Sequence, residues 1–291
     1  MDCGAPCKFH GTRPRRKLPY PRWACYDKTM DALPLTPADP ERADKLAHYL
    51  LRAINKANRK YHLFADGDTI LVAVSGGKDS MTLLDLLRRR QATARERYRL
   101  IAAHIHSDYY CGQTVPEAWL EAWCAAHGIP LVIERVSVAE DIAQMRKSHC
   151  FRCAWVRRKA LFDLADRLGC NVIAFAHHAD DIAETVLLNL FYNARLAWMA
   201  PRVSFFGGKL TVIRPLALVE ERDIPPFVRA SGFPIEGEPC PSALEGRRLL
   251  IKRFLRELES EHHRVKRSIF AAMHRLSQKE KGFSLDQDAD V

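Results

Sequence analysis

The chain has 291 residues, of which 47% are hydrophobic and 27% charged, and these proportions exclude collagen, coiled-coil rods and global disorder. Its net charge of +10 is concentrated in residues 1–30, with seven basic and two acidic side chains, and in residues 246–281, with eleven and four. We therefore expect a polyanionic partner such as nucleic acid, although two solvated charged faces would give the same pattern. The sequence has no apolar run of about 18 residues and no apolar signal segment, so we expect a cytoplasmic protein without a membrane partner. Its nine cysteines are an odd number, which indicates thiols that bind metal or react rather than a set of disulfides.

The first part of the chain predicts an arm and then the start of an α/β domain. Residues 1–40 contain seven prolines and little periodicity, which indicates an extended, partly disordered basic arm. Apolar residues at helical spacing predict a helix over 41–62, and the apolar run over 70–74 predicts a buried parallel strand. An amphipathic helix over 80–90 completes the first strand–helix unit.

The alternation of strand and helix then continues. We expect strands over 100–105, 130–136, 171–176 and 211–215, and helices over 116–127, 154–168 and 181–192. This order predicts an α/β fold with a doubly wound parallel sheet, and helices over 220–230, 246–260 and 264–276 are expected to follow it. We therefore divide the chain into an arm (1–40), a nucleotide-binding domain (41–219), a helical C-terminal region (220–276) and a flexible tail (277–291).

The most specific local feature is a loop between the strand 70–74 and the helix 80–90, with the sequence Ser75-Gly76-Gly77-Lys78-Asp79-Ser80. Two glycines let backbone N–H groups turn inward, and the start of the helix adds unpaired N–H groups and the positive end of its dipole. The serine hydroxyls and the lysine supply further donors for phosphate. The spacing is not that of a Walker A loop, but the strand–loop–helix context predicts a phosphate-binding site.

Three cysteines are the next candidates for chemistry. Cys150 and Cys153 form a CxxC pair before a helix, a spacing that lets two thiolates converge on one metal atom or cluster, and Cys240 follows 87 residues later. Three thiols suit an iron–sulfur cluster that keeps one iron open better than a closed zinc site with four ligands. A zinc site completed by a histidine, a redox disulfide and chance buried thiols remain alternatives.

Together these motifs resemble two nested families. The glycine loop resembles the PP-loop of the ATP pyrophosphatases, whose fold is a five-stranded, doubly wound parallel sheet of the HUP type. Over roughly residues 45–276 the chain resembles the tRNA 2-thiocytidine synthetase (TtcA) family. The motifs that carry this resemblance are Cys150-x-x-Cys153-x-x-x-Arg157-Arg158, His177-His178-x-Asp180-Asp181-x-x-Glu184-Thr185, Pro239-Cys240-Pro241 and Gly246-Arg247-Arg248.

The resemblance implies an ATP-dependent tRNA sulfurtransferase. Such an enzyme adenylates the C2 oxygen of an anticodon-loop cytidine, at position 32 in the family, and replaces that oxygen with sulfur. It implies a 4Fe–4S cluster held by Cys150, Cys153 and Cys240, whose free iron binds the incoming sulfide. It also implies ATP in the loop 75–80, and tRNA and a sulfur donor such as a cysteine desulfurase as partners.

Individual roles follow from the same resemblance. Lys78 is expected to offset the charge that moves onto pyrophosphate, and Mg²⁺ to bridge the phosphates, with Asp79 and Asp181 as candidate carboxylates for the metal or the base. Arg157 is expected to face the phosphates or the tRNA, as is its neighbour Arg158. For the second histidine of the pair, His178, we expect contact with ATP or the base.

Several alternatives stay open from the sequence. A paralogous thiolase acting on another base or RNA, and a zinc-containing nucleic-acid-binding protein, are the competing functions, and a homodimer is left open. A zinc knuckle in the arm is a further option, with Cys3, Cys7, His10 and Cys25 as its ligands. Three other cysteines are interpreted as ordinary buried residues and two tryptophans as core, namely Cys111, Cys124, Cys170, Trp155 and Trp198.

Overall fold

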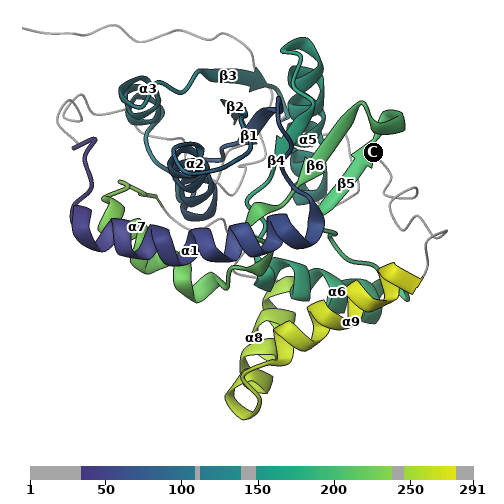
Figure 1. Cartoon of the computed structure of the whole chain (residues 1–291). Helices are drawn as coiled ribbons and strands as arrows, with labels where there is room; N and C mark the ends of the chain where they lie inside the picture. Colours follow the sequence, from purple (N-terminus) through teal and green to yellow (C-terminus); the bar gives the residue numbers. More distant parts are fainter. Residues whose placement is uncertain (1–33, 109–111, 139–148, 238–245, 280–291) are drawn as a thin grey trace, which may run out of the picture. The chain divides into compact units, whose positions relative to one another are not determined.

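The computed structural model describes residues 34–108, 112–138, 149–237 and 246–279 (Figure 1). Helix α1 (Pro40–Tyr61) begins where Asp39 accepts a hydrogen bond from the N–H of Arg42 at 3.1 Å, with a proline at the first helical position. Strand β1 (Thr69–Ala73) follows and is buried along almost its whole length, as expected for the interior of a parallel sheet. The segment Ser75-Gly76-Gly77-Lys78-Asp79-Ser80, called the phosphate loop from here on, then connects β1 to α2 (Lys78–Gln91) and includes the first residues of that helix.

The other elements alternate as predicted, with α5 beginning earlier and β4 shorter than expected. They are β2 (Arg99–Ser107), α3 (Glu117–Ala126), β3 (Leu131–Val136), α5 (His149–Arg167), β4 (Val172–Ala174), α6 (Ala179–Asn193), β5 (Arg202–Phe205), β6 (Leu210–Ile213), α7 (Ile224–Ser231), α8 (Arg247–Glu261) and α9 (Val265–Lys279). Short 3-10 helices lie between some of them, namely η2 (Phe206–Gly208), η3 (Pro215–Leu218) and η4 (Glu221–Asp223). The α/β class of the fold is therefore confirmed.

The sheet has the order β3-β2-β1-β4-β6-β5, and its first five strands are parallel. The five parallel strands that we expected are all present, and the sheet has one strand more than expected, because β5 adds an antiparallel edge to β6. This strand has only four residues, too few for a hydrophobic period to be recognised. A turn at Gly207 and Gly208, both with positive φ, reverses the chain between the two strands.

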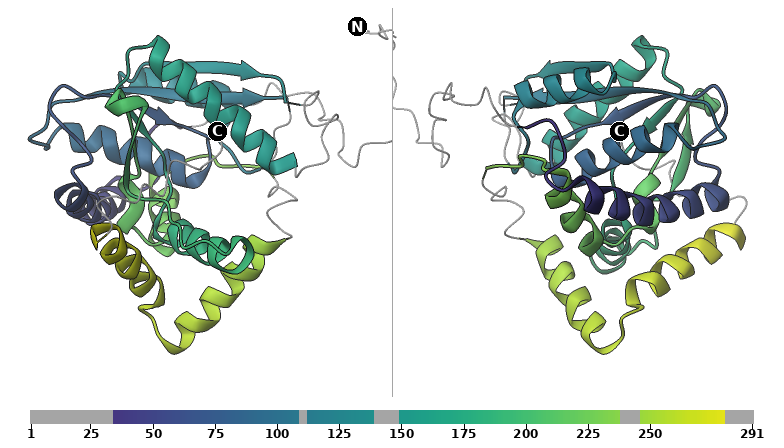
Figure 2. Two further views of the ribbon diagram at one scale, coloured as in Figure 1. Left: turned by 90° about the vertical axis from the view of Figure 1, so that its right-hand side faces the viewer. Right: turned by 60° about the vertical axis from the view of Figure 1, so that its left-hand side comes forward.

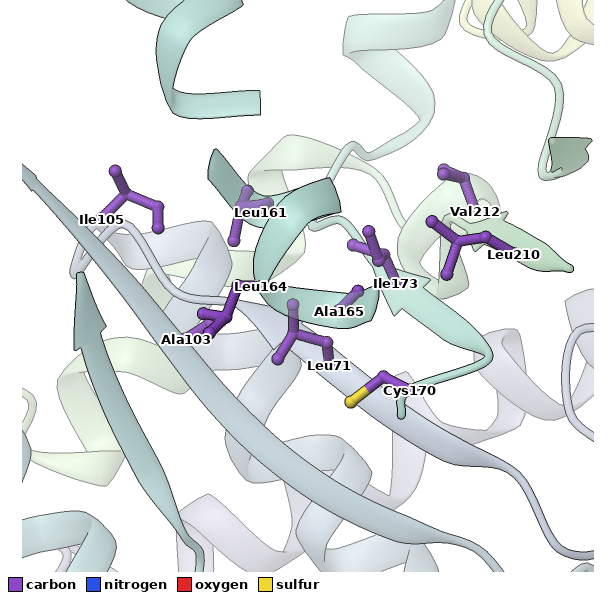
Figure 3. Close-up of a cluster of buried hydrophobic side chains, with 10 residues drawn as sticks. All are labelled: Leu71, Ala103, Ile105, Leu161, Leu164, Ala165, Cys170, Ile173, Leu210 and Val212. Carbon is purple, nitrogen blue, oxygen red and sulfur yellow. The ribbon is translucent and has the colours of Figure 1, made fainter. Parts of the chain in front are cut away.

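Helix α5 covers one face of the sheet, and α2 and α3 cover the other (Figure 1). On the α5 side, Leu161 and Leu164 of the helix pack against Leu71, Ala103 and Ile173 from three neighbouring strands (Figure 3). Burying one fully apolar side chain of this size stabilises a fold by about 1.5–3 kcal/mol relative to leaving it in water. This layer therefore fixes where the first turns of α5 lie relative to the strand ends.

The C-terminal helices extend the core beyond the sheet. Phe270 and Met273 of α9 pack against Ile182 and Val186 of α6 and against the buried Trp198, which confirms the core role predicted for that tryptophan. Figure 2 shows α8 and α9 as the two arms of a V beside α6. Within the described ranges, no helix has both the length and the apolar character that a bilayer-crossing segment needs.

The order of the strands predicts where a ligand binds. From β1 the chain moves outward to β2 and β3 on one side, and then returns to place β4 on the other side of β1. In sheets of this kind, ligands bind beyond the carboxyl ends of the strands at the point where this direction changes. The phosphate loop follows β1, and the histidine pair follows β4.

Candidate functional site

Gly76 determines the path of the phosphate loop. Its φ of +83° lies in the left-handed region, and a Cβ atom built on it would clash with the Thr114 hydroxyl oxygen. The carbonyl of Gly76 accepts a hydrogen bond from the N–H of Val115 at 3.0 Å, so the loop packs directly against the segment that leads into α3. A residue with a side chain fits neither this backbone conformation nor this contact.

The serines close the loop from inside. The Ser75 hydroxyl accepts from the N–H of Gly77 at 3.3 Å and lies 3.1 Å from the Ser80 hydroxyl, which itself donates to the Gly77 carbonyl at 3.0 Å. Gly77 is the N-cap of α2 and brings no side chain to cap it. The first N–H groups of α2 and its positive dipole end therefore remain available for an anion.

Lys78 joins the loop to the C-terminal part of the chain. Its Nζ lies 2.7 Å from Asp79 Oδ1 and 3.3 Å from Glu221 Oε1, and Glu221 also pairs with Lys252 of α8 at 2.6 Å. Burial alone would lower the pKa of Lys78, but the two carboxylates outweigh it and raise that pKa. For Glu221, burial opposes the two lysines, which still hold its pKa at about 2.

His178 begins helix α6 and faces the loop. Its Nδ1 accepts from the N–H of Asp181 at 3.4 Å, and the Asp181 carboxylate accepts from the N–H of His178 at 3.1 Å, which together form a capping box. Its Nε2 lies 3.4 Å from Asp181 Oδ2 and 3.9 Å from Asp79 Oδ1. The structure thus brings together three predicted residues, but it gives His178 a capping position, and its ligand contact stays a prediction.

A cleft of about 920 Å³ opens beside the loop. The phosphate loop contributes Ser75, Asp79 and Ser80, and Asp181 lies across from them on α6. Much of the remaining polar lining is basic, with Arg157 and Arg158 from α5, Arg195 from the loop after α6 and Arg214 after β6. A concave site with guanidinium groups next to the start of a helix that has no side-chain cap is suited to a polyphosphate ligand.

His177, the neighbour that we did not select, lines this cleft. Burial, reinforced by the charge of Arg214, lowers the pKa of His177 to about 3, so its imidazole is neutral at physiological pH. Its Nδ1 is buried and has no hydrogen-bond partner among the described residues. No signal in the sequence shows which histidine lines the cleft. That depends on the residue at which α6 begins, because the histidine at the N-cap of this helix forms the capping box.

Comparison with known proteins shows the family of this chain. Residues 46–240 match the model of the PP-loop domain family. The tRNA-cytidine(32) 2-sulfurtransferase of Geobacter sulfurreducens is 41% identical over 226 residues, which cover 76% of this chain and 87% of that protein. The enzyme of the same name from Cellvibrio japonicus is 35% identical over 82% of this chain and 80% of its own length.

The chain belongs to the tRNA-cytidine(32) 2-sulfurtransferase family of PP-loop proteins. Among solved structures, the U34-tRNA thiolase NcsA from Methanococcus maripaludis, described with its [4Fe-4S] cluster, superposes with a TM-score of 0.66. It is 20% identical, and the match covers 83% of this chain and 82% of that one, so this likeness bears on the fold alone.

The cysteines that we predicted as cluster ligands are only partly described. Cys153 lies half-buried in the first turns of α5, directly before Ala154, which lines the cleft. The side chain of Cys150 and the whole of Cys240 lie outside the described residues, as do Cys111 and the cysteines of the arm. Two thiols predicted to be incidental are indeed buried, and burial raises the pKa of both, namely Cys124 and Cys170.

Sequence reasoning included Asp180, Glu184 and Arg248 in motifs but missed the ion pairs that support the site from the C-terminal helices. Asp180 is buried, accepts from the N–H of Glu221 at 2.7 Å and pairs with Lys266 of α9. Arg248 of α8 lies 3.7 Å from both Asp181 and Glu184 of α6. The glycine-arginine-arginine motif carried a signal for Arg248, whereas the pairing of Glu221 with Lys78 depends on tertiary placement alone.

Proposed function

We propose that this chain is an ATP-dependent tRNA thiolase that adenylates the C2 oxygen of cytidine 32 and replaces it with sulfur. The observation that carries the proposal is one shared cleft. It joins the phosphate loop, at Ser75 and Ser80, to Ala154 and Arg157 in the helix that begins with the CxxC pair. Activation by ATP and transfer of sulfur must both occur at the C2 position of the base. This cleft is lined by residues from the phosphate loop and from the helix of the CxxC pair.

The first step is activation of the base. The C2 oxygen attacks the α-phosphorus of ATP, the bond from that phosphorus to the bridging oxygen breaks, and pyrophosphate leaves. The backbone N–H groups of the loop and of α2 would bind the departing phosphates, and Lys78 would offset the charge that accumulates on them. The resulting adenylate turns a poor leaving group into AMP.

Sulfide then adds to C2, the C2–oxygen bond breaks, and AMP leaves. Arg157 and Arg158 line the cleft, and their guanidinium groups would hold the phosphate of AMP through both steps. The neutral imidazole of His177, with its unpartnered Nδ1, offers a hydrogen-bonding group for the cytosine ring. Each of these roles differs from that of Lys78 and can be tested separately.

The residues suit the cofactors that the family implies. Asp79 and Asp181 supply carboxylate oxygens at the cleft, the donors that Mg²⁺ prefers, and the metal would neutralise phosphate charge. Cys153 lies in the first turns of α5, and with Cys150 and Cys240 it would complete a three-thiolate set. A cluster held there would supply sulfur bound at its open iron.

The surface beside the cleft supports RNA as the substrate. Exposed aromatic and aliphatic side chains gather on the end of α6 and on α8, namely Leu190, Phe191, Tyr192, Leu250 and Phe254. The guanidinium of Arg247 lies 4.6 Å from the ring centre of Tyr192. Aromatic rings interleaved with arginines are the groups on which unstacked bases of single-stranded RNA loops pack.

Three finer points belong to the same proposal. We expect the protein to act in the cytoplasm, where its tRNA substrate is found, and to receive sulfur from a cysteine desulfurase or another donor. A homodimer is compatible with this mechanism.

The deciding experiment measures tRNA nucleosides by mass spectrometry in a deletion strain. The wild-type gene should restore 2-thiocytidine, whereas Lys78→Ala and Cys240→Ala should not. Lys209→Ala, an exposed lysine in the β5–β6 turn, is the matched control and should behave as wild type. Unchanged 2-thiocytidine in the deletion strain would reject cytidine 32 as the target, and loss of another thionucleoside would identify a paralogous thiolase.

A further inference from the structure

Three metal-ligand side chains meet behind the phosphate loop. His104 and His106 lie on β2, and Glu117 is the first residue of α3. One ligand atom from each of the three lies within 4.8 Å of the other two. Side chains alternate along a strand, so these histidines project from the sheet face opposite to that of Ala103 and Ile105, which line the cleft.

We propose that His104, His106 and Glu117 bind a zinc ion. Two imidazoles and one carboxylate are a known ligand set for this metal, with a fourth position left to water or another ligand. Nitrogen and oxygen donors of this kind also favour zinc over Mg²⁺ or Ca²⁺, which prefer all-oxygen sites. The proposal concerns a site separate from the cleft and does not depend on the proposed function.

His104 is already oriented as a ligand. Its Nδ1 lies 2.8 Å from the carbonyl oxygen of Val74, and a carbonyl can only accept, so this nitrogen carries the proton. The lone pair is therefore on Nε2. A backbone carbonyl that fixes the tautomer in this way is the usual outer partner of a metal-binding histidine. The residue is also buried, so its ring has little freedom to leave this orientation.

His106 and Glu117 complete the set from two different elements. Nδ1 of His106 donates to Glu117 Oε2 at 2.9 Å, because a carboxylate can only accept, and a zinc ion bound between these two atoms would replace this hydrogen bond and hold them about 3.4 Å apart. The other carboxylate oxygen, Oε1, accepts from Arg135 at 2.5 Å, and Arg135 is paired with His106 across β2 and β3. Arg135 thus orients the carboxylate, and the second oxygen, Oε2, faces His106.

The site is connected to the phosphate loop on both sides. Val74, whose carbonyl holds His104, directly precedes Ser75, and the segment before Glu117 contacts Gly76 through the N–H of Val115. A bound zinc would link the end of β2 to the start of α3 and so support the wall against which Gly76 packs. We therefore expect zinc to stabilise the folded chain in addition to binding it.

The test uses the full chain with its cluster assembled, and zinc alone as the probe. Protein is dialysed against buffered Zn²⁺, bound zinc is counted by mass spectrometry, and its neighbours are identified by X-ray absorption at the zinc edge. Wild type should bind one more zinc than His106→Ala or Glu117→Gln. That zinc should show nitrogen and oxygen neighbours at about 2.0–2.1 Å, whereas zinc on thiols shows sulfur at about 2.3 Å.

The controls separate binding from folding and from catalysis. Glu117→Gln keeps the shape of the side chain, so it should fold as wild type without zinc but lose zinc affinity by about tenfold or more and lose the zinc-dependent rise in Tm. His262→Ala, an exposed histidine after α8, should bind zinc as wild type does. Equal zinc in wild type and both site variants, or zinc bound by sulfur alone, would overturn the proposal. Iron content and 2-thiocytidine, measured in parallel, report on the proposed function instead.

Discussion

Gly76 is the residue on which the phosphate loop depends most. Gly76→Ala places a Cβ in a left-handed conformation, which costs about 1–2 kcal/mol, and also drives it into Thr114. We expect a loss of stability beyond that backbone cost and a loss of ATP binding, measured by urea unfolding and calorimetry. Gly128→Ala has a similar φ of +64° and meets nothing within 4 Å, so it should show the backbone cost alone. Equal effects of the two substitutions would contradict the role given to the Thr114 contact.

His177 makes a second residue-scale prediction, on acid stability. In the unfolded chain its imidazole takes up a proton below about pH 6.5, whereas the folded chain holds its pKa at about 3. The unfolded state binds more protons between these values, so stability falls as pH falls from 6.5. His177→Asn should flatten this fall by up to about 1.4 kcal/mol per pH unit, measured by urea unfolding at pH 7.5, 6.5 and 5.5. Parallel curves for the two proteins would show that burial does not hold His177 neutral.

At the scale of elements, hydrophobic periodicity predicted the alternation of strands and helices because long apolar faces are a local property. Strand β5 was missed because it is a short edge strand. Only one of its residues, Val203, is buried. The zinc-ligand set was missed for a different reason. His104 and Glu117 are thirteen residues apart but belong to different elements, and they meet only after β2 and α3 are placed against each other. The phosphate loop, in contrast, is one continuous segment and was visible in full.

The ion pair between α6 and α9 gives a prediction about the stability of the fold. Lys266 of α9 pairs with the buried Asp180 at the start of α6, and that carboxylate also accepts from the N–H of Glu221. Lys266→Met should destabilise the fold by about 3 kcal/mol, because it leaves a buried carboxylate without its cation. Lys159→Met removes an exposed pair with Asp163, one turn away on α5, and should cost less than about 1 kcal/mol. Equal losses in urea unfolding would mean that Asp180 is hydrated.

For the whole molecule, charge is the property that bears on the partner. The near-neutral α/β part contains the cleft, and α8 presents basic side chains next to the exposed aromatic residues of α6. If tRNA lies across this surface, each phosphate contact releases counterions, so affinity must fall with salt in proportion to the number of contacts. If net charge alone attracts tRNA, removing any two basic residues should change the salt dependence of binding by the same amount. If tRNA lies on one specific surface, only residues of that surface should change it.

Paired substitutions distinguish these two cases. Arg253 and Arg256 are exposed on α8, and Arg52 and Arg59 are exposed on α1. Changing the α8 pair to alanine should lower the slope of log Kd against log salt by roughly 0.7–0.9 for each arginine, measured by filter binding of unmodified tRNA. Changing the α1 pair removes the same charge and should leave that slope as in wild type. If both pairs lower the slope alike, RNA is attracted by overall charge, and α8 is not the surface that holds it.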